Sequence, residues 1–302
     1  MKIIFWGTPD FAVPSLKILL ENNHHIQSVV TSPDKERGRG QKVSYTAIKE
    51  FALKNNISIL QPDKLRAQDF INNLNSMDCD LYVVVAFKIL PREIFTIPKY
   101  GSFNLHASLL PKYRGAAPIQ WTLIKGETET GVTAFALEDK VDTGNIYLQK
   151  IIPILPEDNF GTLHDKLSIL GAKVVLETVN SIENGTFQLQ SQSDELASPA
   201  PKVTKEIMQI DWNKSADEVH NLIRAFSPSP GAFFIHNQKL IKIFSTKLEN
   251  DKVLSPGEFL ERKDKLFVGC GSGTLEVFEI QFEGRRKMTM AEFLRGYSFS
   301  NQ

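Results

Sequence analysis

Cysteine is nearly absent from this chain of 302 residues, which contains only Cys79 and Cys270. Zinc sites and redox motifs use closely spaced cysteines, and neither residue has a second cysteine nearby. Two cysteines so far apart also do not form the disulfide framework of a small secreted domain. The two cysteines therefore indicate neither a metal or redox site nor a disulfide framework. We expect each to be a small, buried, apolar residue of a protein in a reducing compartment.

Long apolar runs and an excess charge of either sign are also missing. No stretch approaches the roughly 20 apolar residues of a membrane-spanning helix, and the first residues do not read as a signal peptide, so we expect a soluble, cytoplasmic protein. The chain has 35 Lys and Arg against 35 Asp and Glu, a net charge of zero. Residues 201–302 alone carry a net +2, from 15 basic and 13 acidic side chains. Any contact with RNA must therefore come from local basic clusters.

The first predicted turn has one glycine where a dinucleotide-binding fold would have three. The apolar run at 2–6 predicts a buried strand, and Gly7–Thr8–Pro9–Asp10 follows it as a tight turn. A mostly apolar helix at 11–20 and a strand at 26–31 complete a strand–helix–strand unit, which implies a parallel sheet. Because the G-x-G-x-x-G fingerprint is missing, a nicotinamide-dependent dehydrogenase is disfavoured.

Further apolar runs extend this unit into an α/β domain over residues 1–182. Strands are expected at 57–60, 81–87, 101–106, 130–137 and 146–152. Helices are expected near 45–54, 69–75, 117–125 and 163–182. We predict a Rossmann-like, open, parallel-rich sheet with helices on both faces.

The last third of the chain has a different pattern. Residues 183–206 lose apolar periodicity and are rich in Ser, Gln, Asp and Pro, which indicates a linker that could wrap the first domain. After a helix at 215–226, short strands are expected at 232–235, 239–245, 266–269 and 274–280. This spacing predicts a small, OB-like β-barrel in a C-terminal domain over 207–302.

Asn104 and His106 stand two apart at the end of the strand expected at 101–106. Side chains two apart in a strand share a face, so the amide and the imidazole should point into one pocket at the carboxyl edge of the sheet. Asp142 follows the next strand. An Asn-x-His pair alone is more often structural than catalytic. An amide donor, a titratable ring and a carboxylate to hold that ring nevertheless form a plausible acyl-transfer site.

Residues 104–118 read Asn–Leu–His–Ala–Ser–Leu–Leu–Pro–Lys–Tyr–Arg–Gly–Ala–Ala–Pro. This string resembles the signature of the folate-dependent formyltransferases, in which an Asn, a His and a later Asp form the catalytic group. Gly–Thr–Pro–Asp–Phe at 7–11, Asp–Trp–Asn–Lys–Ser–Ala at 211–216 and Glu–Phe–Leu–Arg–Gly at 292–296 extend the resemblance over nearly the whole chain. It is closest to the methionyl-tRNA formyltransferases. It implies transfer of the formyl group of 10-formyltetrahydrofolate, without a metal, to the α-amine of initiator methionyl-tRNA for translation initiation.

The resemblance implies three groups of site residues. The catalytic residues would be Asn104, His106 and Asp142. The folate pocket would be lined by Ser108, Leu109, Leu110, Pro111, Phe87, Ile89 and Leu90. The last three lie in a segment, 86–91, that is one residue shorter than the family pattern and lacks its glycine. The tRNA would contact Arg39 and Lys42 of the polar loop 32–42, and the compact basic patch Arg285, Arg286 and Lys287.

Other functions remain open at this stage. A formyltransferase for a nucleotide-sugar amine would share the three catalytic residues but is usually fused to a second Rossmann domain. A glycinamide-ribotide formyltransferase would end near residue 200, and a deformylating hydrolase would typically carry an N-terminal regulatory domain. From a different class, a non-catalytic tRNA-binding protein would not need the Asn104, His106 and Asp142 set. No heptads or large apolar edge indicate self-association, so we expect a monomer.

Overall fold

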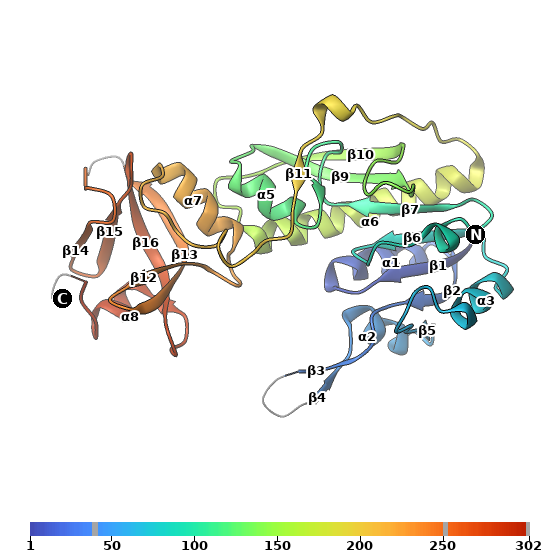
Figure 1. Cartoon of the computed structure of the whole chain (residues 1–302), viewed down its shortest axis with the longest axis horizontal. Coiled ribbons are helices and arrows are strands. Elements are labelled where there is room, and N and C mark those ends of the chain that lie inside the picture. The colour runs from blue at the N-terminus through green and yellow to red at the C-terminus, as the bar shows by residue number, and fades with distance from the viewer. Residues whose placement is uncertain (38–41, 250–252, 300–302) are drawn as a thin grey trace. The chain divides into compact units, whose positions relative to one another are not determined.

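A seven-stranded sheet organises the larger of the two units into which the chain divides, in the order β10-β9-β7-β6-β1-β2-β5 (Figure 1). Its strands are β1 (Lys2–Gly7), β2 (His25–Val30), β5 (Ser58–Leu60), β6 (Leu81–Val85), β7 (Ser102–His106), β9 (Glu129–Ala136) and β10 (Ile146–Pro153). The strands from β7 to β5 pair in parallel, and β9 runs antiparallel to β7. The parallel-rich α/β sheet predicted from the sequence is therefore confirmed.

The computed structural model describes residues 1–37, 42–249 and 253–299. Unit 1 comprises Met1–Pro118, Glu129–Ile152 and His164–Ala200; unit 2 comprises Ile119–Thr128, Pro153–Leu163 and Pro201–Gln302. Residues 183–200 of the predicted linker thus lie in unit 1. Within the described ranges, no helix is both long enough and apolar enough to cross a membrane.

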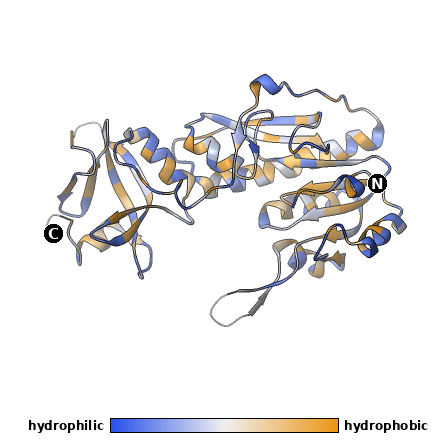
Figure 2. Cartoon of the chain, viewed as in Figure 1, coloured by the Kyte–Doolittle hydropathy of each residue, from blue (hydrophilic) through white to orange (hydrophobic). Residues whose placement is uncertain are grey.

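Two layers of helices cover the sheet of unit 1. The helices of unit 1 are α1 (Val13–Glu21), α2 (Ala47–Lys54), α3 (Gln68–Ser76), α4 (Arg92–Phe95) and most of α6 (Phe160–Asn184), whereas α5 (Pro118–Ile124) belongs to unit 2 apart from its first residue. On one face, Trp6 and Tyr82 pack with Phe70 of α3 and Ile94 of α4 in a buried apolar cluster. On the other face α6 passes so close to β7 that a Cβ on Gly171 would lie 2.5 Å from the side chain of Leu105. Figure 2 shows that apolar residues concentrate in these strands.

The strand order creates a switch point between β1 and β6. The chain leaves β1 toward β2 on one side and leaves β6 toward β7 on the other, so the carboxyl ends of these two strands lie together where the connections diverge. Open α/β sheets bind ligands in the crevice at such points. The sheet pairing therefore places the segment after β6, residues 86–91, and the end of β7 at the ligand-binding edge of unit 1.

Unit 2 is built on an antiparallel sheet in the order β12-β13-β16-β15-β14, with β17 added to β16. Its elements are α7 (Ala216–Ala225), β12 (Ala232–His236), β13 (Lys239–Glu249), β14 (Phe259–Arg262), β15 (Lys265–Gly269), β16 (Thr274–Phe282), β17 (Met288–Thr289) and α8 (Met290–Leu294). Strands β12 and β14 would lie about 19 Å apart in a flat sheet, at about 4.8 Å per step. The rings of Phe234 and Phe259 nevertheless stack at 5.7 Å. The sheet is therefore strongly curled, as in a small open barrel.

Several local features differ from the sequence predictions. The polar loop 32–42 and the two residues after it include an antiparallel pair, β3 (Lys35–Arg37) and β4 (Lys42–Ser44), which lacks the apolar alternation that would have predicted it. Strand β14 was missed because charged residues interrupt its short apolar run. His24 stands among polar residues in the sequence but is only 8% exposed, and its Nε2 lies 3.1 Å from Asn180 Oδ1 on α6.

Burial protects both thiols from reaction. Cys79 and Cys270 are buried and free, and burial raises the pKa of each to about 11. Because thiolate is the reactive form, we predict that neither residue is labelled by an aromatic disulfide reagent at pH 8 in the folded protein, and that both are labelled in urea. The unfolded thiols lose their protons at lower pH than the folded ones, so these residues also lower the free energy of unfolding as the pH rises from about 9 to about 11. Labelling of either thiol at the rate of a free cysteine in the folded state would contradict this burial.

Candidate active site

The end of β7 carries the two polar residues singled out in the sequence. Asn104 and His106 alternate with buried Phe103 and Leu105, so they share one face of the strand. On the neighbouring strand β9, Phe135 lies opposite Asn104 and Thr133 lies opposite His106. The sheet therefore fixes the backbone from which both polar side chains project.

His106 is held by a backbone carbonyl. Its side chain is 7% exposed, and its Nε2 lies 2.8 Å from the carbonyl oxygen of Tyr113. A carbonyl can only accept, so Nε2 carries a proton and donates it. The Phe135 ring and the imidazole pack edge to face, with 6.5 Å between their centroids. In the neutral ring, the proton on Nε2 leaves Nδ1 as the nitrogen with a free lone pair.

Asp142 faces that free nitrogen. Its Oδ2 lies 3.9 Å from Nδ1 of His106 and accepts a 2.8 Å hydrogen bond from the backbone N–H of Gly115. The distance to Nδ1 is too long for a direct hydrogen bond. The ring is thus oriented by Tyr113, whereas the sequence interpretation gave this task to Asp142. Nδ1 of His106 and Oδ2 of Asp142 are both proton acceptors, and they face each other across 3.9 Å. They are suited to share a single proton, or to accept hydrogen bonds from one donor that lies between them.

The side-chain amide of Asn104 is available for a ligand. It is only partly buried, and it makes no hydrogen bond to any residue in the described ranges. A half-buried amide that the protein leaves unpaired can donate to an oxygen brought next to it without breaking an existing bond. The arrangement therefore offers one donor, Asn104, beside one base, His106, and one fixed carboxylate, Asp142.

The loop after His106 is fastened to β9 and β10. Thr133 accepts hydrogen bonds from the N–H of Leu110 and from the amide of Gln149, and donates to the carbonyl of Ser108. The Gln149 amide also donates to the carbonyl of Leu110. Ser108 and Leu110 are almost fully buried. The predicted folate-pocket residues Ser108, Leu109, Leu110 and Pro111 thus belong to a loop whose backbone shape is set before any ligand arrives.

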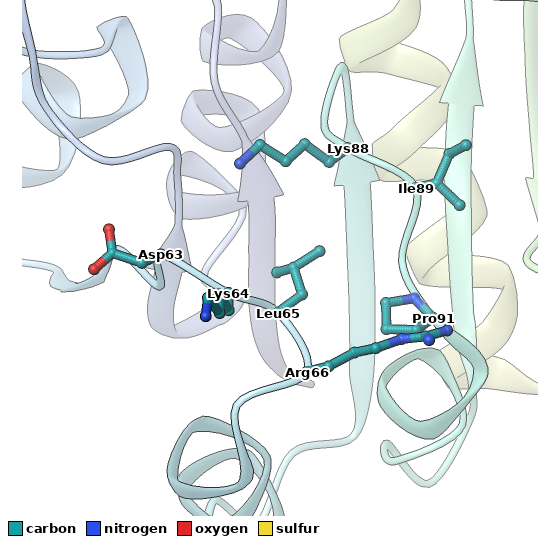
Figure 3. Close-up of a pocket in the computed structure, with 7 residues that line it drawn as sticks. All are labelled: Asp63, Lys64, Leu65, Arg66, Lys88, Ile89 and Pro91. Atoms are coloured by element: carbon teal, nitrogen blue, oxygen red, sulfur yellow. The ribbon is translucent and has the colours of Figure 1, made fainter.

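The other predicted folate segment, residues 86–91, contains both core residues and an exposed one. Leu90 is 6% exposed within the apolar cluster, and Phe87 packs edge-on against Trp6 at 5.5 Å between ring centroids. Ile89 is 72% exposed and lines an open hollow of about 490 Å³ together with Leu65, Pro91, Asp63, Lys64, Arg66 and Lys88 (Figure 3). The segment turns at Ala86, whose φ of 50° lies in the left-handed region. Ile89 is therefore the predicted pocket residue of this segment whose side chain is free to meet a ligand.

The predicted tRNA contacts belong to both units. Arg39 falls outside the described residues, and Lys42 opens strand β4. In unit 2, Arg286 pairs with Glu292, and Lys287 pairs with Glu279 while its ammonium lies 5.2 Å from the centre of the Phe244 ring. Arg285 makes no ion pair within the described ranges. The patch of three basic residues is thus partly neutralised by its neighbours.

Four residues that complete the site were missed in the sequence. The carbonyl of Tyr113 and the N–H of Gly115 act through the backbone, so their residue types carry no signal for these roles. Thr133 is recognisable only from its register opposite His106. Gln192 donates to the carbonyls of Asp142 and Gly144 from 50 residues along the chain. No cluster of three or more His, Cys, Asp or Glu side chains in the described residues could hold a metal.

Comparisons with known proteins agree on one family. Residues 1–179 match the family described as formyl transferase, and residues 202–298 match the formyl transferase C-terminal domain. A methionyl-tRNA formyltransferase of Caldanaerobacter subterraneus subsp. tengcongensis is 46% identical, over 99% of this chain and 97% of the relative. One from Flavobacterium johnsoniae is 43% identical, over 100% and 98%.

Among solved structures, WlaRD, a sugar 3N-formyl transferase crystallised in the presence of dTDP and 5-N-formyl-THF, matches with a TM-score of 0.72. Its identity is 25%, over 95% of this chain and 99% of that one. HypX from Aquifex aeolicus in complex with tetrahydrofolic acid matches with a TM-score of 0.68 at 19% identity, over 97% of this chain and 47% of that one. At that identity the likeness to HypX shows the fold alone.

The glycine after the Asp142 turn is required by close packing. A Cβ at Gly144 would lie 1.8 Å from the carbonyl oxygen of Ala136, whereas a Cβ at Gly296 would meet no atom within 4 Å. We predict that Gly144→Ala lowers the free energy of unfolding by about 2 kcal/mol or more. The control Gly296→Ala should stay within about 0.5 kcal/mol of the parent, as measured by urea unfolding. Equal stability of the two variants would contradict the packing described for the Asp142 turn.

Proposed function

Because the chain belongs to the formyl transferase family, we propose that it transfers the formyl group of 10-formyltetrahydrofolate to the α-amino group of initiator methionyl-tRNA. Relatives named methionyl-tRNA formyltransferase support this substrate, at identities of 46% and 43% over nearly the full length of both chains. The observation that carries the proposal is the side-chain amide of Asn104, which makes no hydrogen bond within the described residues and shares a strand face with His106, whose Nδ1 faces Asp142.

Asn104 stabilises the charge that develops during transfer. When bound, 10-formyltetrahydrofolate supplies the formyl carbon to which the amine adds, and negative charge then collects on the formyl oxygen. Asn104 donates its unpaired amide N–H to that oxygen. A single preorganised donor of this kind is typically worth about 2.7–4 kcal/mol of barrier. Because the sheet already fixes the backbone of Asn104, little reorganisation is needed as the charge appears.

His106 accepts the proton that the attacking amine must lose. Its Nε2 is occupied by the Tyr113 carbonyl, so Nδ1 is the nitrogen that acts as base. The carboxylate of Asp142, 3.9 Å from Nδ1, stabilises the imidazolium that results. The same nitrogen then returns the proton to the departing folate nitrogen, directly or through one water. None of these reaction steps requires a metal ion.

Two loops offer a fitting place for the reduced pterin. The loop Ser108–Pro111 is held rigidly by Thr133 and Gln149, so its backbone groups are available at fixed positions. The segment 86–91 presents Ile89 to solvent at the switch point of the sheet. A flat, partly apolar ring with hydrogen-bonding edges suits a site of rigid backbone and exposed aliphatic groups. We therefore assign folate binding to these loops, with Phe87 and Leu90 supporting Ile89 from the core.

An acceptor as large as initiator tRNA implies further contacts outside the catalytic residues. We propose that the C-terminal domain over 207–302 binds tRNA, with Arg285, Arg286 and Lys287 among the phosphate contacts and Arg39 and Lys42 contributing from the first domain. We propose that the enzyme works in the cytoplasm. We propose that it acts as a monomer, because one chain contains every residue of the catalytic set.

Replacing the catalytic side chains tests the reaction directly. We predict that Asn104→Ala lowers kcat for methionyl-tRNA formylation by about 10²–10³-fold, since one oxyanion donor is lost. His106→Ala should lower kcat by about 10²–10⁴-fold through loss of the base. The measurement is the initial rate of formyl transfer from 10-formyltetrahydrofolate, with tRNA binding measured in parallel. Parental rates in His106→Ala would contradict the catalytic assignment.

The same assay decides between two acceptors. The match to WlaRD over 99% of its length favours a sugar amine as the second candidate. Charged initiator tRNA and a dTDP-amino-sugar are therefore offered separately to the parent protein. Formylation of the tRNA alone supports the proposed function, and formylation of the amino-sugar alone refutes it.

The unpaired arginine of the basic patch should contribute to the salt dependence of tRNA binding. Each phosphate contact that is lost reduces the slope of log affinity against log salt by about 0.7–0.9. We predict this change for Arg285→Ala, together with weaker binding. Lys173→Ala, which removes an exposed cation from α6, serves as the matched control and should leave the slope unchanged. Identical slopes for the two variants would remove Arg285 from the tRNA contacts.

A further inference from the structure

Residues 190–200, which we call the strap, lie against the candidate active site. Neither family match includes the strap, since one ends at residue 179 and the other begins at residue 202. After α6 the chain continues to β11 (Pro199–Ala200) (Figure 1), which pairs with β8 (Arg114–Gly115). Gln190 exchanges two backbone hydrogen bonds with Ile146 at the start of β10. The strap is therefore an ordered part of unit 1.

The carboxyl end of the strap holds the backbone that binds His106. Ser198 accepts hydrogen bonds at its hydroxyl from the N–H of Tyr113 and at its carbonyl from the N–H of Arg114, each at 2.9 Å. The carbonyl of Ala200 accepts from the N–H of Ala117. Ala200 also packs so closely that a Cβ on Gly115 would lie 2.6 Å from its carbonyl oxygen. The Tyr113 carbonyl that holds His106 is thus held in turn by the strap.

The amino end of the strap holds the turn that carries Asp142. The side-chain amide of Gln192 donates to the carbonyls of Asp142 and Gly144, at 3.0 and 2.8 Å. Its Oε1 accepts from Nε and Nη2 of Arg114, at 3.1 and 2.8 Å. Arg114 is fixed further by a 2.8 Å contact between its Nη1 and Asp194. Gln192 therefore joins the Asp142 turn to the segment that holds His106.

Both segments need such support because both contain a residue with an unfavourable backbone. Tyr113 has a φ of 61° and Asp142 a φ of 57°, in the left-handed region that non-glycine residues rarely adopt. Such conformations are energetically unfavourable and persist only where the surroundings enforce them. Hydrogen bonds from the strap reach the backbone of both residues. Without them, relaxation of either turn would change the distance between Nδ1 of His106 and Asp142.

We propose that Gln192 is a positioning residue for formyl transfer, acting by locking the Asp142 turn at its distance from His106. The expected effect on kcat rests on the proposed function, whereas the support that Gln192 gives to the Asp142 turn does not depend on it. Gln192 touches no reacting atom. Its effect reaches the reaction through Asp142, so it should disappear when the Asp142 carboxylate is removed.

Two substitutions separate its donor and acceptor roles. Gln192→Leu removes both, and Gln192→Glu keeps an acceptor for Arg114 but cannot donate to the two carbonyls. We expect both to lower kcat by about 10–100-fold, because displacements near 1 Å cost rates of this order. The KM for each substrate should change by less than about threefold, since no ligand contact is lost. Gln190→Leu, at an exposed glutamine two residues away, should behave like the parent.

A double-mutant cycle distinguishes positioning from general stabilisation. In the Asp142→Asn background, Gln192→Leu should reduce kcat by less than about threefold more, because both changes act on one group. If Gln192 acted independently of Asp142, the fold-reduction in kcat of the double variant would equal the product of the two single fold-reductions. That result, or a Gln192→Leu variant with the parental kcat, would overturn the proposal.

Amide hydrogen exchange gives a readout that does not need activity. The N–H of Gly115 is bound to Asp142 Oδ2, so its exchange reports whether that turn stays in place. We expect exchange at Gly115 to rise at least tenfold in Gln192→Leu and to stay unchanged in Gln190→Leu. Unchanged exchange in Gln192→Leu would overturn the proposal. A parent that formylates no methionyl-tRNA would refute the proposed function, while the exchange comparison would still decide the positioning role.

Discussion

The hydrogen bond from His106 to the carbonyl of Tyr113 is the interaction on which the rest of the site depends. At 2.8 Å, with a buried imidazole, it assigns the proton of the neutral ring to Nε2. Nδ1 is then the nitrogen left to accept a proton, and it is the nitrogen that faces Asp142. If the ring were released from Tyr113, either nitrogen could carry the proton and the carboxylate would no longer face a free lone pair. One backbone carbonyl thus sets both the direction and the chemistry of the base.

That carbonyl is placed by segments far apart in the sequence. Strand β7 supplies the imidazole, the turn at Tyr113 supplies its acceptor, and the turn after β9 supplies Asp142. The strap binds the backbone of both turns, although it lies outside the two regions matched to the family. The positive φ angles of Tyr113 and Asp142 show that neither turn follows ordinary local preference. Tertiary hydrogen bonds, rather than local sequence preference, therefore stabilise the conformations of these two turns.

The sequence was sufficient to predict the sheet, and it singled out the residues that we propose for the active site. The apolar residues 3–6 and 81–85 are buried on both faces of the sheet, and such continuous apolar runs are a strong local signal for central parallel strands. Asn104 and His106 stood out because alternation along a strand is a simple period. The orientation of the His106 ring could not be predicted, because the Tyr113 carbonyl has no side-chain signature. The burial of His24 likewise has no local signal, since its partner Asn180 lies on a helix more than 150 residues away.

The tautomer of His106 is the most direct test of this account. Nitrogen chemical shifts in protein labelled with ¹⁵N-histidine distinguish a protonated from an unprotonated ring nitrogen, and a His106→Gln variant assigns the signal. The account predicts that the neutral ring carries its proton on Nε2, with Nδ1 showing the shift of a nitrogen with a free lone pair. A neutral His106 protonated on Nδ1, or one exchanging equally between the two forms, would contradict it.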